Sequence, residues 1–190
     1  MIKIPDKMKA MMLTEYNKLE LATVPVPKPG RGEVLCRIRA VALCGSDPKM
    51  IEGGYKFANW PPSFPFIMGH EWAGEVVALG EGVEEFKIGD RVAGEAHAGC
   101  GVCDNCKRGH YTVCLNYGRD GKDGRLDLGH RHYGFYWQGA NAEYNVYKTN
   151  TLHLIPDNVS YDAASLCDCA GVAFHGVELA GVTPGGTSVV

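Results

Sequence analysis

The sequence predicts a mainly β domain of short strands, followed by the beginning of an α/β unit. Twenty-five glycines and ten prolines among 190 residues favour frequent turns and therefore short strands. Short alternating or β-branched runs recur as far as Pro156, and small residues compatible with a helix take over after Ser160. This change in character predicts two units, at 1–158 and 159–190.

The first unit contains several runs with the pattern of strands, at 9–13, 19–22, 33–42, 75–79, 88–93 and 141–147. A turn around Asn17 joins the first two, and residues 24–30 form an extended connector because proline has no amide donor. The third strand ends immediately before Cys44. A short helix follows over 46–52, with Ser46 as its expected N-cap.

The most specific pattern is the run Gly69-His70-Glu71-Trp72-Ala73-Gly74, followed by Gly80 and Val83. Its glycines allow tight turns, and a neutral imidazole is the commonest protein ligand for zinc. A His–Glu pair alone is more often a surface pair or a satisfied core histidine. Here Cys44-Gly45-Ser46-Asp47 and Asp168 add further thiol and carboxylate groups, and together they predict a metal site.

A second, independent pattern is a cluster of four cysteines separated by two, two and seven residues, at Cys100, Cys103, Cys106 and Cys114. Four thiolates this close can form a tetrahedral shell around one zinc ion. The alternative, a disulfide cluster, needs an oxidising compartment, whereas the polar start of the chain lacks the apolar core of a signal peptide. We predict a structural zinc in a lobe at about 97–116.

The second unit is expected to begin with a helix. Ser160 is a suitable N-cap, and one helix is predicted over 163–180. Three residues are spaced for one face of that helix: Val172, His175 and Leu179. A turn at 184–186 and a strand from 187 follow, which is how a Rossmann unit begins.

These motifs resemble those of the zinc-containing medium-chain alcohol and polyol dehydrogenases. The family signature is Gly-His-Glu, two residues, Gly, five residues, Gly, two residues and a small or apolar residue, and residues 69–83 match it at every fixed position. The resemblance implies that 1–158 is a GroES-like, partly open barrel carrying the zinc lobe and the catalytic site. It also implies that 159–190 leads into a nucleotide-binding domain.

The resemblance also implies the cofactors, namely two Zn²⁺ ions per chain, one catalytic and one structural, and NAD or NADP. Cys44 and His70 match the first two ligands of the catalytic zinc. The third ligand has three alternatives, which correspond to the secondary-alcohol, liver-type and polyol branches of the family: Asp168, Cys169 and Glu71.

Two further residues have expected roles beside this zinc. Ser46 matches the hydroxyl that hydrogen-bonds the substrate oxygen and starts a proton relay, although it would also serve as a helix cap. Asp47 is expected to orient His70 from behind, and its alternative role is that of an ordinary acid at a helix start.

The implied activity is the zinc-dependent interconversion of an alcohol, either a secondary alcohol or a polyol, and a carbonyl compound. The alternative is a non-enzymatic zinc-binding GroES-like fragment without a cofactor domain. No Gly-x-Gly-x-x-Gly loop follows the helix that would cradle a pyrophosphate. We therefore expect the chain to be the catalytic-domain portion of a longer enzyme, inactive on its own.

Composition limits the partners. A formal net charge of −3 without a basic stripe argues against nucleic acid and anionic membranes. No run approaches the ~20 apolar residues of a membrane span, and a cytoplasmic location is expected. The resemblance implies a homo-oligomer, a dimer or tetramer, at full length. Two histidines, His130 and His132, would line a pocket for a polar substrate or simply pack, together with Arg131, Tyr133, Tyr136 and Trp137.

Overall fold

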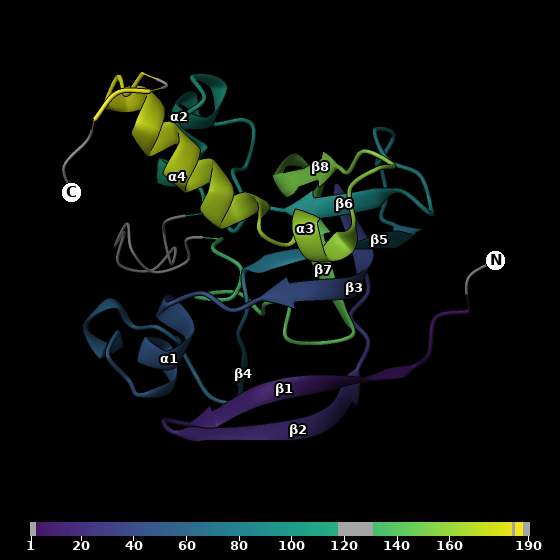
Figure 1. Cartoon of the computed structure of the whole chain (residues 1–190). Coiled ribbons are helices and arrows are strands. Elements are labelled where there is room, and N and C mark those ends of the chain that lie inside the picture. The colour runs from purple at the N-terminus through teal and green to yellow at the C-terminus, as the bar shows by residue number, and fades with distance from the viewer. Residues whose placement is uncertain (1–2, 118–130, 184, 188–190) are drawn as a thin grey trace.

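The computed structural model describes residues 3–117, 131–183 and 185–187, and its described part folds as two antiparallel sheets with short helices around them (Figure 1). The three-stranded sheet has the order β2-β1-β4, with β1 at Lys7–Glu15, β2 at Lys18–Pro25 and β4 at Phe66–Ile67. The five-stranded sheet has the order β7-β3-β5-β6-β8. Its strands are β3 Glu33–Ala42, β5 Glu71–Leu79, β6 Arg91–Gly94, β7 Tyr144–Lys148 and β8 Leu152–Leu154. The mainly β prediction is confirmed.

The hairpin of β1 and β2 follows the predicted pattern. The strands pair from Lys7 opposite Pro25 to Glu15 opposite Lys18, with an irregularity between Leu13 and Glu15, and the turn contains Asn17 with a φ of 63°. Asparagine tolerates this left-handed conformation better than most residues. The hairpin therefore forms where the local sequence placed it.

The pairing of β3 with β5 brings the predicted metal ligands together. Ala42 lies opposite Glu71, so that Cys44, just after β3, arrives where His70 precedes β5. His70 also lies where the chain passes from β4 in one sheet to β5 in the other. Antiparallel register thus explains why residues so far apart in sequence meet.

One motif glycine is required by this pairing. A Cβ atom on Gly74 would stand 2.3 Å from the carbonyl oxygen of Arg37 on the neighbouring strand. Any larger residue would separate the two strands at this point.

The core of the five-stranded sheet is built on the inward residues of its strands. Trp72 is stacked on Tyr147 with ring centroids 4.1 Å apart, and both side chains are fully buried. Smaller residues fill the space around them, including Val34, Cys36, Val76, Val92 and Ala140. Cys36 is the buried, packing thiol that its place in an alternating strand indicates.

The short helix after Cys44 differs from expectation in its cap. Helix α1 spans Ser46–Ile51, with Gly45 at the N-cap and no capping bond from a side chain. The prediction that Ser46 caps this helix is therefore wrong. Ser46 is instead the first residue of the helix, and the carboxylate of Asp47, in the first turn, accepts a hydrogen bond of 2.9 Å from the amide of Cys44.

A helical region forms where it was predicted after Ser160, but it consists of two helices instead of one. Ser160 caps α3 (Tyr161–Ala164) by accepting a bond of 3.1 Å from Ala163 N, as predicted. The expected single helix over 163–180 is instead interrupted, and α4 spans Cys167–Leu179. The strand expected from 187 lies largely outside the described residues.

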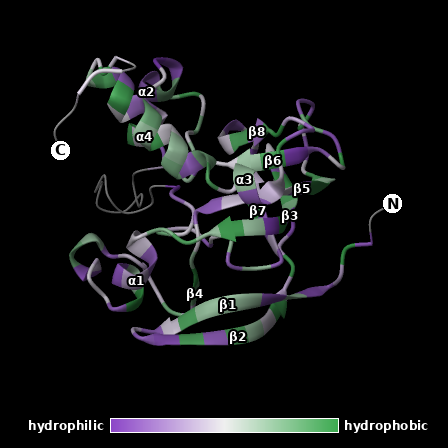
Figure 2. Cartoon of the chain, in the orientation of Figure 1, coloured by the Kyte–Doolittle hydropathy of each residue, from purple (hydrophilic) through white to green (hydrophobic). Residues whose placement is uncertain are grey.

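Helix α4 projects from the five-stranded sheet and carries hydrophobic residues along its length (Figure 2). The side chains of Val172 and Leu179, expected on one face, are 72% and 75% exposed, and Phe174 is 65% exposed. None of the helices in the described ranges combines the length and apolar character needed to cross a bilayer.

Candidate metal centres

The four cysteines of the lobe converge as their spacing predicts. The sulfur atoms of Cys100, Cys103, Cys106 and Cys114 all lie within 4.8 Å of one another, and none forms a disulfide. Helix α2 (Asp104–Lys107) follows Cys103 and turns Cys106 back toward it. This arrangement has the number and type of donors of a closed, tetrahedral zinc site.

Backbone amides point at these sulfur atoms. Cys103 N donates to the sulfur of Cys100 at 3.3 Å, and Cys106 N donates to that of Cys103 at 3.5 Å. The bond from the Cys106 amide helps lower the pKa of the Cys103 thiol to about 6, whereas burial raises the pKa of Cys106 to about 12. Amide donors of this kind stabilise thiolates, the form that binds metal.

Two side-chain hydrogen bonds fix the lobe beside the five-stranded sheet. Tyr111, in the single helical turn Tyr111–Val113, donates to Glu95 at 2.6 Å. Asn150, in the turn Thr149–Thr151 before β8, donates to the carbonyl of Gly99 at 2.8 Å. The lobe is therefore held against the sheet at both of its ends.

A second group of donors forms at the end of β3 and the start of β5. Ligand atoms of Cys44, His70 and Glu71 all lie within 4.8 Å of one another. His70 and Glu71 are 6% and 5% exposed, and the distance from His70 Nε2 to Glu71 Oε1 is 4.0 Å. A thiol, an imidazole and a carboxylate at this spacing match a catalytic zinc site with an open fourth position.

Asp47 lies behind this group, on the side of His70 Nδ1. One carboxylate oxygen accepts from Cys44 N, and the other is 4.0 Å from His70 Nδ1. Within the described residues, neither Nδ1 of His70 nor Oδ1 of Asp47 has a hydrogen-bond partner, although both are buried. A slight tightening of this contact would fix the tautomer that leaves Nε2 free for a metal.

The three donors open into a cleft of about 520 Å³. Ser46 lies in its wall, and its buried hydroxyl has no hydrogen-bond partner among the described residues. Asp168 and Cys169 face the same cleft from α4, but neither belongs to the compact group of three. The thiol of Cys169 donates to the carbonyl of Leu166 at 3.2 Å.

The carboxyl of Asp168 has a raised pKa. Burial is the main cause, and the negative charges of Glu71 and Glu95 add to it, whereas His70 opposes them. Because Glu71 and Glu95 place negative charge near Asp168, this group of carboxylates attracts a cation and repels an anion. Asp168 is therefore well suited to face a positive charge in this cleft.

Another part of the cleft is aromatic, and the sequence predicts only one of its residues. His132, a predicted pocket residue, lines the cleft with His97, Trp60 and Phe135. The rings of His132 and Phe135 are stacked with centroids 4.0 Å apart. His130, noted with them, lies outside the described residues. No local sequence signal marks Trp60 or Phe135, because loop packing alone brings them here.

The comparisons with known proteins agree with this geometry. Residues 30–157 match the family model of the alcohol dehydrogenase GroES-like domain. The chain is 34% identical over 187 residues to sorbitol dehydrogenase of Bacillus subtilis (strain 168), which covers 98% of this chain and 49% of the relative. It is 39% identical over 158 residues to L-threonine 3-dehydrogenase of Escherichia coli O1:K1 / APEC, covering 82% of this chain and 41% of the relative.

A solved structure is also similar. Acetophenone reductase from Geotrichum candidum NBRC 4597, solved in complex with NAD, has a TM-score of 0.77 at 29% identity over 95% of this chain and 50% of its own. The chain thus spans about half the length of the curated relatives it matches.

Proposed function

Because this chain belongs to the alcohol dehydrogenase GroES-like domain family, we propose that it forms the catalytic portion of a zinc-dependent alcohol or polyol dehydrogenase. Residues 1–158 are the catalytic domain, and 159–190 lead toward a nucleotide-binding domain. The hydride acceptor is NAD or NADP, and the partners are a small alcohol or carbonyl compound and, at full length, further copies of the protein. The location is cytoplasmic.

The observation that carries this proposal is the convergence of Cys44, His70 and Glu71 in one cleft. Their donor types suit Zn²⁺, and a carboxylate beside the second ring nitrogen, as Asp47 lies beside His70 Nδ1, is the usual support of a metal-bound imidazole. A zinc ion bound there would supply a Lewis acid for the alcohol or carbonyl oxygen of the substrate. The four-cysteine lobe would hold a second, structural zinc ion.

The protein groups around the site have distinct tasks. Ser46 is placed to accept the proton of the substrate hydroxyl and pass it on, since its own hydroxyl is otherwise unpartnered. Asp47 holds the Cys44 backbone and faces the His70 ring, so it orients both ligands. Trp60 and Phe135 form an apolar wall that excludes water beside the reacting oxygen.

The geometry supports Glu71 as the third ligand, because it belongs to the compact group. Asp168 then faces the site from α4 and balances its charge. Cys169 is the least favoured alternative, since its thiol already donates to Leu166.

Metal analysis of Glu71→Gln, Asp168→Asn and Cys169→Ser tests this assignment. We expect Glu71→Gln to empty one of two sites while the lobe stays loaded. Asp168→Asn should weaken the same site by ~10-fold, the lower end for an outer partner, and Cys169→Ser should have little effect. If Asp168→Asn alone empties the site, the ligand set is that of the secondary-alcohol branch.

Activity is measured on the full-length protein, with secondary alcohols and polyols and with both nicotinamide cofactors. We expect turnover that a chelator removes and Zn²⁺ restores. Two bound metals without any turnover on these substrates would instead favour the non-enzymatic zinc-binding alternative.

A further inference from the structure

The segment of residues 131–141, here called the support segment, packs directly on the backbone that carries His70. Its amides donate to three successive carbonyl groups: Gly139 to Ile67 at 2.7 Å, Asn141 to Met68 at 2.9 Å and Ala140 to Gly69 at 2.8 Å. The backbone leading into the metal ligand therefore has its position fixed by the support segment. A displacement of the support segment would therefore also displace the backbone around Gly69, which leads into His70.

Side chains of the support segment also contact the imidazole itself. The ring of Phe135 is 4.6 Å from that of His70, centroid to centroid, and His132 is stacked on Phe135. Phe135 is 5% exposed, so the stack has little room to shift. The orientation of the His70 ring depends on these contacts as well as on Asp47.

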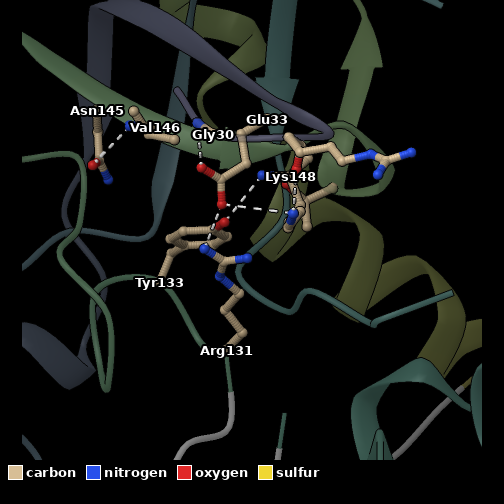
Figure 3. A network of polar contacts seen from close by, with 9 residues as sticks. Gly30, Glu33, Arg131, Tyr133, Asn145, Val146 and Lys148 are labelled. Atoms are coloured by element: carbon tan, nitrogen blue, oxygen red, sulfur yellow. Dashed lines mark hydrogen bonds and ion pairs between the residues drawn. The ribbon is translucent and has the colours of Figure 1, made fainter. Parts of the chain in front are cut away.

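The support segment begins at an ion pair that lies away from the cleft. Arg131 donates to Glu33, at the start of β3, over 2.6 Å, and Lys148 Nζ is 3.7 Å from the same oxygen (Figure 3). The other oxygen of Glu33 accepts from Gly30 N at 2.9 Å. The side chains of Arg131 and Glu33 are only 11% and 13% exposed, so solvent screens this pair weakly.

The environment favours the ionised pair. Burial alone would raise the pKa of the Glu33 carboxyl, but the Gly30 amide and the Arg131 and Lys148 charges bring it below its ordinary value. The guanidinium also lies 4.2 Å from the centroid of the Trp137 ring. A bond from Ala98 N to the carbonyl of Arg131, at 2.9 Å, fixes the backbone at the same point. The start of the support segment is therefore held by both its side chain and its backbone.

We propose that the Glu33–Arg131 ion pair is a positioning element for the metal-binding His70, acting through the support segment. This inference rests on the proposed function, because it assumes that His70 binds a metal. Arg131 and Glu33 touch neither metal nor substrate in this scheme. Their effect is to keep Phe135 and the backbone around Gly69 in the arrangement that aims His70 at Cys44 and Glu71.

The test measures metal binding rather than turnover. Co²⁺ is titrated into the metal-free chain, because its visible absorption distinguishes a four-thiolate shell from a shell with one thiolate. Arg131→Met and Glu33→Gln each remove the ion pair. We expect either variant to weaken Co²⁺ binding at the Cys44 site by ~10-fold, the lower end for residues supporting a metal ligand, and to broaden its absorption band. The signal of the lobe should stay unchanged.

Controls separate positioning from general damage. Arg39→Met removes an arginine of β3, whose ion pair with Glu75 spans 3.8 Å and is partly exposed, and it should leave both sites unchanged. Arg131→Lys keeps the charge without the planar guanidinium and should give an intermediate loss. It also carries the test if Arg131→Met fails to fold. In the double variant of Arg131→Met and Glu33→Gln, the losses should be less than additive, because both single changes break one interaction.

Three outcomes are informative. Selective weakening of the Cys44 site supports the inference. Unchanged Co²⁺ affinity and spectrum in the folded variants, or equal loss at both sites, overturns it. If the unaltered chain binds Co²⁺ only in its lobe, the proposed function itself fails, a result distinct from failure of the ion pair.

Discussion

Replacing Gly134 by alanine tests whether the support segment and His70 share one rigid arrangement. Gly134 has a φ of 80°, and a Cβ atom there would stand 2.6 Å from the carbonyl oxygen of Gly69 and 3.2 Å from Cβ of His70. The substitution therefore combines an unfavourable backbone conformation with a collision against the carbonyl of Gly69 and a tight contact with His70, the proposed metal ligand.

A matched control separates the two contributions to the loss of stability. Gly89 has a φ of 96° and open space where its Cβ would be, so Gly89→Ala loses only the stability that a left-handed backbone conformation costs, roughly 1–2 kcal/mol. Gly134→Ala also displaces a backbone carbonyl, so we expect its free energy of unfolding to fall by ~3–4 kcal/mol. For a domain of this size, 1 kcal/mol shifts Tm by roughly 2–4 °C.

The assay is thermal unfolding of the two zinc-loaded variants, followed by metal analysis. Gly89→Ala should lower Tm by about 4 °C and retain both metals, whereas Gly134→Ala should lower it by about 10 °C and lose the metal bound by His70. Equal Tm shifts for the two variants, with both metals retained, would show that the segment yields without moving His70.

Three further predictions follow from contacts described above. A chelator should remove the metal at Cys44 before that of the lobe, measured as two phases of zinc release, because four thiolates close the lobe while the other site has an open position; a single phase would contradict this. Tyr111→Phe removes the hydrogen bond to Glu95 and should lower the free energy of unfolding in urea by ~1 kcal/mol. In the unaltered chain this bond raises the pKa of Tyr111 to about 12. Its stabilisation is therefore present below pH ~10, the ordinary tyrosine pKa, and is lost as pH rises toward 12, so the difference in stability between Tyr111→Phe and the unaltered chain should narrow there. Ser160→Ala should cost ~1 kcal/mol through loss of the α3 cap, and Ser160→Asp should largely restore it.

The sequence allowed the strands and the metal donors to be predicted because their signals are local. The alternation over β3 and the spacing of the four cysteines depend on neighbouring residues only; the strand forms, and the four sulfur atoms lie together. Ser46 shows the limit of such signals. Its type suits an N-cap, but the helix begins at Ser46 itself, so that Gly45 occupies the N-cap position.

Long-range contacts could not be predicted in this way. Arg131 and Glu33 are 98 residues apart, and only the pairing of distant strands and loops brings them together. Local sequence patterns also do not indicate which of Asp168, Cys169 and Glu71 would be the third metal ligand. Neighbours in a regular strand point to opposite faces, which would separate Glu71 from His70. Gly69, with a φ of 91°, turns the chain just ahead of β5, and both side chains reach the cleft.

Helix α4 links the cleft to the exterior of the chain. Asp168 lies in its first turn, and no residue of the helix is buried. If a molecule that covers Phe174 and Leu179 shifts α4, it changes the placement of the Asp168 carboxylate, and a cation in the cleft acts on that same carboxylate. Thermodynamic linkage makes such a coupling reciprocal. The factor by which the covering molecule raises the affinity for the cation equals the factor by which the cation raises the affinity for the covering molecule. The affinity of the cleft for metal should then report, at a distance, whether the outer face of α4 is occupied.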